Sequence, residues 1–74
     1  MEETIRQIFV DELGCEVAAL TPECRLREDL GVSSLEMLGV VLALEDQFSI
    51  TIDEADLPGI ATFQDVVAYI RAHT

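Results

Sequence analysis

Ser34 lies in a ten-residue stretch, residues 29–38, whose residue types and order could carry chemistry. Gly31 predicts a turn, and an apolar run typical of a helix begins at Leu35. The hydroxyl of Ser34 is therefore expected in the first turn of that helix. Unpaired backbone N–H groups and the positive end of the helix macrodipole favour an attached or bound phosphate at such a place. No other segment of the chain offers a site of comparable specificity.

The two neighbouring serines have different expected roles. Ser33 and Glu36 form the S-x-x-E pattern of a capping box, in which the Ser33 hydroxyl accepts a hydrogen bond from the Glu36 N–H. Ser34 then occupies the first helical position, and its side chain is not needed for the cap. Local chemistry leaves two interpretations of Ser34 open: an ordinary serine at a helix start, or a serine that is modified.

Catalysis by the chain itself is not indicated. A nucleophilic serine requires a base, and the one histidine is His73, next to the last residue. The order of Asp53, Glu54 and Asp56 does not match a calcium loop, and two cysteines cannot supply the four ligands of a zinc site. We therefore expect no catalytic residues and no metal site, which predicts a protein that is not an enzyme.

The charge balance restricts the class of partner. The chain has 15 acidic residues against 4 arginines and no lysine, for a net charge of −11. This balance excludes nucleic acid, which needs a positive surface, and disfavours anionic membranes. It favours basic protein partners, although a charge that serves only solubility is the alternative. Mutual repulsion between such chains also predicts a monomer.

Two cysteines, the absence of a signal-peptide pattern and the absence of a membrane-length apolar stretch predict a cytoplasmic protein. Cys15 and Cys24 are then expected as free thiols in a reducing compartment. A disulfide between them is the alternative that the sequence leaves open.

The elements that must position Ser34 can be predicted from the periodicity of apolar residues. We expect helices over residues 3–13, 34–48, 53–57 and 62–73, which makes residues 1–74 a single all-α domain. Gly14 is expected to cap the first helix, Asp53 to cap the third, and Pro58-Gly59 to end it. Residues 50–52 are too short a run to build a sheet. Thr62 and Asp65 resemble a capping box at the start of the last helix, whose inner stripe would be Phe63, Val66, Val67 and Ile70. The long connection 15–32 is expected to contain one turn around residues 22–25 and to lie on the core. Its anchors would be four apolar residues: Val17, Leu20, Leu26 and Leu30.

Several motifs together resemble the acyl carrier protein family. The quoted motifs are Leu30-Gly31-x-Ser33-Ser34-Leu35, Val41-x-Ala43-Leu44-Glu45-x-x-Phe48 and Thr62-Phe63-x-Asp65-Val66-x-x-Tyr69-Ile70. The resemblance covers nearly the whole chain. It implies a four-helix bundle with a short third helix and a long loop between the first two helices.

The resemblance also implies a function. Ser34 would carry 4′-phosphopantetheine, which a phosphopantetheinyl transferase takes from coenzyme A, and the arm would hold acyl groups as thioesters. The bundle could open to shelter an apolar chain. The second helix would dock acyl-processing enzymes with basic patches. The implied docking residues are Leu35, Leu38 and Leu42, flanked by the charges of Glu36 and Glu45.

The sequence departs from the family pattern at two positions near this site. Ser33 replaces the usual aspartate, and Gly39 stands where the family usually has glutamate. Both changes remove negative charge, and they favour a specialised pathway over housekeeping fatty-acid synthesis. The expected role is therefore that of an acyl carrier in fatty-acid, polyketide or related specialised biosynthesis. An unloaded protein-interaction module and an aminoacyl or peptidyl carrier are the alternatives.

Overall fold

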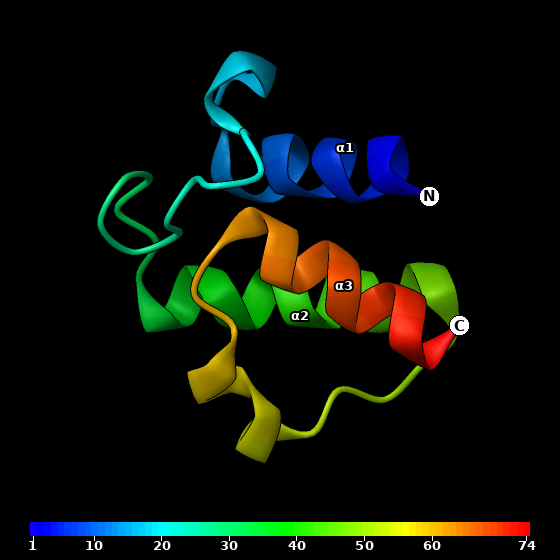
Figure 1. Ribbon diagram of the computed structural model, residues 1–74. Coiled ribbons are helices and arrows are strands. Elements are labelled where there is room, and N and C mark those ends of the chain that lie inside the picture. The colour runs from blue at the N-terminus through cyan, green and yellow to red at the C-terminus, as the bar shows by residue number, and fades with distance from the viewer.

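Three α-helices and two short 3₁₀ helices build the molecule. The computed structural model describes residues 1–74 with the elements α1 (Glu2–Leu13), η1 (Val17–Ala19), α2 (Ser34–Phe48), η2 (Glu54–Gly59) and α3 (Phe63–His73). The all-α prediction is confirmed, with η2 as the short third helix, and the predicted bounds of α2 are those observed. In Figure 1, α1 runs opposite to α2 and α3, so that both ends of the long connection lie near the start of α2. None of the helices is long and apolar enough to cross a membrane.

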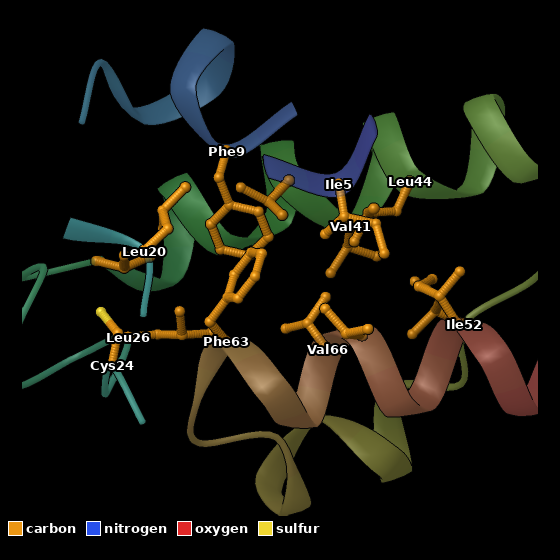
Figure 2. Packing of buried hydrophobic residues seen from close by; sticks show 14 residues of the cluster. Ile5, Phe9, Leu20, Cys24, Leu26, Val41, Leu44, Ile52, Phe63 and Val66 are labelled. Carbon is orange, nitrogen blue, oxygen red and sulfur yellow. The ribbon is translucent and has the colours of Figure 1, made fainter. Parts of the chain in front are cut away.

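The core is entirely apolar and lies between the three α-helices (Figure 2). Phe9 of α1 meets Phe63 of α3 edge to face, with ring centroids 5.3 Å apart, which is a favoured aromatic geometry. The predicted inner stripe of α3 is confirmed, because its four residues are all buried. The buried residues are Ile5, Phe9, Leu20, Cys24, Leu26, Val32, Val40, Val41, Leu44, Ile52, Phe63, Val66, Val67 and Ile70.

The connection from α1 to α2 lies against this core. Gly14 adopts φ 68° and its N–H donates to the Val10 carbonyl, which confirms the predicted left-handed cap. Leu20 and Leu26 are buried as predicted, but Val17 is 56% exposed. The expectation for Val17 is therefore wrong: the unpredicted helix η1 turns this residue outward. The turn expected around residues 22–25 is a single hydrogen-bonded turn that begins at residue 21 and does not continue as a helix.

The same connection is tied to the beginning of α3 by backbone hydrogen bonds. Leu26 N–H donates to the Ala61 carbonyl at 2.9 Å, and Phe63 N–H donates to the Cys24 carbonyl at 2.9 Å. Thr62 and Asp65 complete the predicted capping box of α3. These bonds satisfy backbone groups that would otherwise be unpaired at a helix start.

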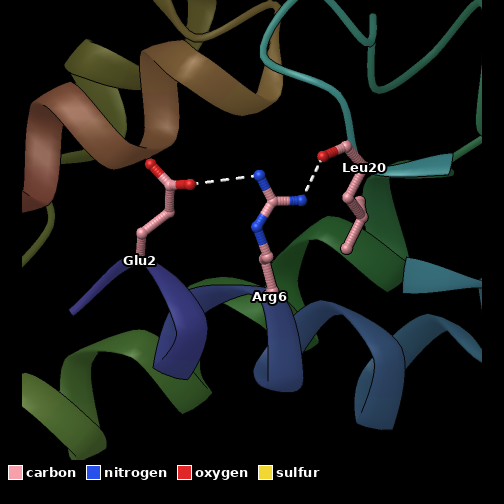
Figure 3. A network of polar contacts seen from close by, with 3 residues as sticks. All are labelled: Glu2, Arg6 and Leu20. Carbon is pink, nitrogen blue, oxygen red and sulfur yellow. Dashed lines mark hydrogen bonds and ion pairs between the residues drawn. The ribbon is translucent and has the colours of Figure 1, made fainter. Parts of the chain in front are cut away.

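A polar contact fixes α1 to the connection. The Arg6 guanidinium donates to the Leu20 carbonyl and pairs with Glu2 at 3.1 Å (Figure 3). It also lies 4.9 Å from the centroid of the Phe63 ring, within the range of a cation–π contact. Arg6 thus joins α1, the connection and α3 at one point.

The segment after α2 forms no strand, as predicted for residues 50–52. Asp53 caps η2, with its Oδ1 accepting from Ala55 N–H at 2.9 Å. The prediction that Pro58-Gly59 ends this helix is wrong, because η2 includes both residues. The fixed φ of proline suits a 3₁₀ helix, so Pro58 stops an α-helix without stopping this one.

Candidate functional site

The turn before α2 delivers two serines to its N-terminus. Gly31 adopts φ 67°, a conformation that glycine accepts at low cost. Val32 follows as a buried anchor, and its N–H donates to the Leu26 carbonyl at 3.0 Å. The chain therefore leaves the core at Val32 and presents the next two residues at the surface.

Ser33 is the N-cap of α2 and confirms the predicted capping box. Its Oγ accepts from Glu36 N–H at 3.1 Å, and its own N–H donates to Glu36 Oε1 at 3.0 Å. The Ser33 hydroxyl thus pairs with the backbone N–H of Glu36, and the Glu36 carboxylate pairs with the backbone N–H of Ser33. Ser33 has a complete structural role in this arrangement.

Ser34 is the first residue of α2, is exposed, and has a hydroxyl without a hydrogen-bond partner in the protein. The backbone N–H groups of Ser34 and Leu35 donate to no protein atom either. These two donors and the helix dipole create a positive field beside the hydroxyl. Since the side chain makes no hydrogen bond within the fold and lies beside two free backbone donors, the residue fits a phosphate ester.

Ser34 also lines a surface groove of about 650 Å³. Met37 and Leu38 continue its wall along α2, and the opposite wall comes from η2 and the residues that follow it. Remaining residues of the lining are Arg27, Glu28, Val32, Glu54, Leu57, Pro58, Ile60 and Ala61. The hydroxyl of Ser34 therefore lies beside a hollow in the surface and not on a flat face.

An apolar edge extends from Ser34 along the exposed side of α2. Leu35, Leu38 and Leu42 are 78%, 50% and 57% exposed. Their spacing of three and four residues places them along one face of the helix. The three leucines therefore form an exposed apolar strip along α2.

The two acidic residues expected beside this edge have structural contacts as well. Glu36 belongs to the capping box. Glu45 is partly buried, and its Oε2 accepts from Ile52 N–H at 2.8 Å, which holds the segment after α2 in place. The sequence did not predict this second contact, because the pattern of residues gives no signal that links positions 45 and 52.

The one histidine lies far from Ser34. His73 is in the last turn of α3, stacked on Tyr69 with ring centroids 4.0 Å apart. Because α2 and α3 run in the same direction, the start of α2 and the end of α3 lie at opposite ends of the bundle (Figure 1). His73 therefore cannot act as a base for Ser34. No three His, Cys, Asp or Glu side chains are grouped so that they could hold a metal ion.

Both cysteines are free thiols in the structure. Burial raises the pKa of Cys15 and of Cys24, and the carboxylate of Asp29 adds to the effect at Cys24. Thiols with raised pKa values are poor nucleophiles. The two side chains therefore act as small apolar groups, and Cys24 belongs to the core.

Comparison with known protein families agrees with this site. Residues 3–70, nearly the whole chain, match the family PP-binding, described as a phosphopantetheine attachment site. This family match accounts for a free hydroxyl at a helix start in a chain that has no catalytic base beside it. The protein therefore belongs to the phosphopantetheine-attachment family, in the acyl-carrier-like form that its motifs resemble, and serves as a carrier of covalent 4′-phosphopantetheine.

Proposed function

We propose that Ser34 is the attachment residue and that the protein carries acyl intermediates in fatty-acid, polyketide or related specialised biosynthesis. The observation that supports this assignment is the contrast between the two serines. Ser33 Oγ is engaged by Glu36 N–H at 3.1 Å, whereas Ser34 is exposed and has no partner. Only Ser34 can be esterified without the loss of a helix cap.

Attachment forms one bond and breaks another. The Ser34 oxygen bonds to the pantetheine-bearing phosphorus of coenzyme A, and the bond from that phosphorus to the bridging diphosphate oxygen breaks. Adenosine 3′,5′-bisphosphate leaves, and the hydroxyl proton passes to the transferase. When bound, the arm supplies a terminal thiol that holds an acyl group as a thioester. The protein itself orients the phosphate at the start of α2, where two backbone N–H groups are free. In this proposal the chain is not an enzyme, and partner enzymes carry out the chemistry.

The exposed edge of Leu35, Leu38 and Leu42 is the proposed docking surface for the transferase and for acyl-processing enzymes. The edge begins at Ser34, so a partner seated on it would have its active site close to the arm. With a net charge of −11, the chain would attract enzymes with basic patches, and Glu36 and Glu45 would flank the contact. Complementary charge accelerates such encounters and makes them sensitive to salt.

We also propose a monomeric protein in a reducing, cytoplasmic compartment. Two unpaired thiols suit such a compartment, and the high like charge opposes self-association. A single folded domain that includes residues 1–74 agrees with one continuous apolar core.

Intact-mass measurement tests the attachment residue. The purified protein is incubated with coenzyme A and a transferase of broad specificity. We expect the wild type to gain one phosphopantetheine, Ser34→Ala to gain none, and Ser33→Ala to gain one. If Ser34→Ala gained a phosphopantetheine and Ser33→Ala did not, Ser33 would be the attachment residue. Absence of any gain with several transferases would contradict the loaded carrier and favour an interaction module.

A further inference from the structure

The four arginines differ in whether they form an ion pair within the protein. Arg6 pairs with Glu2, and Arg25 pairs with Asp29 at 3.2 Å. Arg27 and Arg71 form no ion pair and no side-chain hydrogen bond with the protein. Arg71 lies in the last turn of α3, away from the groove beside Ser34, whereas Arg27 lines that groove. Arg27 is the one basic residue in the lining.

Backbone hydrogen bonds fix the position of Arg27 relative to Ser34. The Gly31 N–H donates to the Arg27 carbonyl at 3.1 Å, and the Val32 N–H donates to the Leu26 carbonyl at 3.0 Å. These bonds fold residues 26–32 into a closed turn that ends immediately before the two serines. Arg27 is exposed, so its side chain is free to reach a group at the mouth of the groove.

The charged side chains around Ser34 are mostly acidic, and Arg27 is the exception. A phosphodiester adds a negative charge to a chain that already has −11, and Glu28 and Glu54 line the same groove. Glu36 lies two residues beyond Ser34. An unpaired guanidinium in this setting is the one side chain near the site that attracts a phosphate, and guanidinium–phosphate hydrogen bonds are short and strong.

We propose that Arg27 binds the phosphodiester of the arm on Ser34 and directs the arm along the groove between α2 and η2. This inference rests on the proposed attachment at Ser34. Together with the free N–H groups of Ser34 and Leu35, the guanidinium surrounds the phosphate with donors from two segments. The arm then leaves the phosphate in a defined direction.

Nuclear magnetic resonance of the apo and holo forms tests the contact without a measurement of activity. The Nε–H resonances of Arg27 and Arg71 are followed in ¹⁵N-labelled wild type as the apo protein is converted to the holo form. The ³¹P resonance of the diester is then compared in holo wild type, holo Arg27→Gln and holo Arg71→Gln. Arg71→Gln is the matched control, because it removes the same charge from an exposed arginine outside the groove.

We expect the Arg27 Nε–H resonance to shift on loading and that of Arg71 to stay in place. The ³¹P resonance should move in Arg27→Gln and keep its wild-type position in Arg71→Gln. An unmoved Arg27 resonance with the same ³¹P position in all three proteins would overturn the proposal and leave Arg27 free for a carboxylate on a partner. Equal shifts for both arginines would also overturn it, since they would report net charge alone. If the wild type never gains the arm, the attachment at Ser34 fails; if it does and these spectra do not change, the inference about Arg27 alone fails.

Discussion

At the scale of single residues, adjacent serines differ in hydrogen bonding because a helix start assigns them different geometry. The N-cap Ser33 has extended backbone angles that point its hydroxyl back at Glu36 N–H. Ser34 already has its place in the helix, and its side chain projects outward. A carrier needs both properties side by side: a rigid helix start and a hydroxyl that the fold does not use.

Replacement of Ser33 by alanine should lower stability without loss of attachment. The Glu36 N–H would lose its acceptor, and loss of such a cap costs about 1 kcal/mol. Urea denaturation of the apo proteins measures the change in the free energy of unfolding. Ser34→Ala serves as the control and should stay within about 0.5 kcal/mol of wild type, as expected for a surface position without contacts. Equal losses in both variants would show that Ser34 has a structural contact after all.

At the scale of elements, the position of η2 decides whether the core can admit an apolar chain. A wholly apolar cavity of about 10 Å³ lies between α2, η2 and α3. It has room for no more than about one water molecule, so a longer chain can enter only if η2 moves away. Tyr69 opposes that movement, because its hydroxyl donates to Asp56 Oδ2 at 2.8 Å and accepts from Asp53 N–H at 3.4 Å.

Tyr69→Phe removes the hydroxyl that holds η2 and keeps the aromatic ring that lines the cavity, so η2 should become more mobile. We expect several-fold faster amide hydrogen exchange in η2 and unchanged exchange in α1, which does not contact the hydroxyl. The hydrogen bond to Asp56 raises the pKa of Tyr69 above the ordinary value of 10.0. Its contribution to stability is therefore complete below pH 10 and is lost as pH rises through the folded pKa. An exchange rate in η2 that does not differ from wild type at neutral pH would contradict this role.

Gly39 in the middle of α2 should limit stability. A Cβ at this position would lie 3.0 Å from Glu12 Oε1, which is the movable end of an exposed side chain. We therefore expect Gly39→Ala to raise the free energy of unfolding by up to about 1 kcal/mol, as helix propensity dictates. Gly39→Glu should gain less, because it places a second carboxylate beside Glu12. A loss of stability in Gly39→Ala would mean that the Glu12 side chain of α1 cannot move away from the added methyl group.

Local patterns predicted the helices, and non-local contacts account for most of what was missed. The bounds of α2, both capping boxes and the buried stripe of α3 follow from residues within a few positions of one another. The exposure of Val17 could not be predicted, since apolar character alone does not say whether a loop residue reaches the core. The Glu45–Ile52 bond and the place of Arg27 in the groove depend on how distant segments meet. The sequence therefore indicated Ser34 from its local motif, but it did not predict the groove beside Ser34, because distant segments form that groove.

At the scale of the whole molecule, repulsion among the acidic side chains destabilises the folded state. A net charge of −11 is confined within principal extents of 26 × 23 × 20 Å. The Debye length is about 30 Å at 0.01 M salt, so the acidic side chains then repel one another across the whole molecule. At 0.15 M it is about 8 Å, and only near neighbours still interact. Repulsion within the compact state should therefore fall as salt is added.

We expect the melting temperature to rise between 0.01 M and 0.15 M NaCl, by about 4–8 °C for each kcal/mol of repulsion that is screened. Glu16→Gln and Asp46→Asn provide the matched test, since both side chains are exposed and make no hydrogen bond or ion pair. The double variant should melt at a higher temperature than wild type in low salt, and the difference should shrink in high salt. If repulsion were unimportant, wild type and variant would show the same melting temperature at both salt concentrations. A modified carrier should respond more steeply than the apo form, because the phosphodiester adds one more negative charge to the same volume.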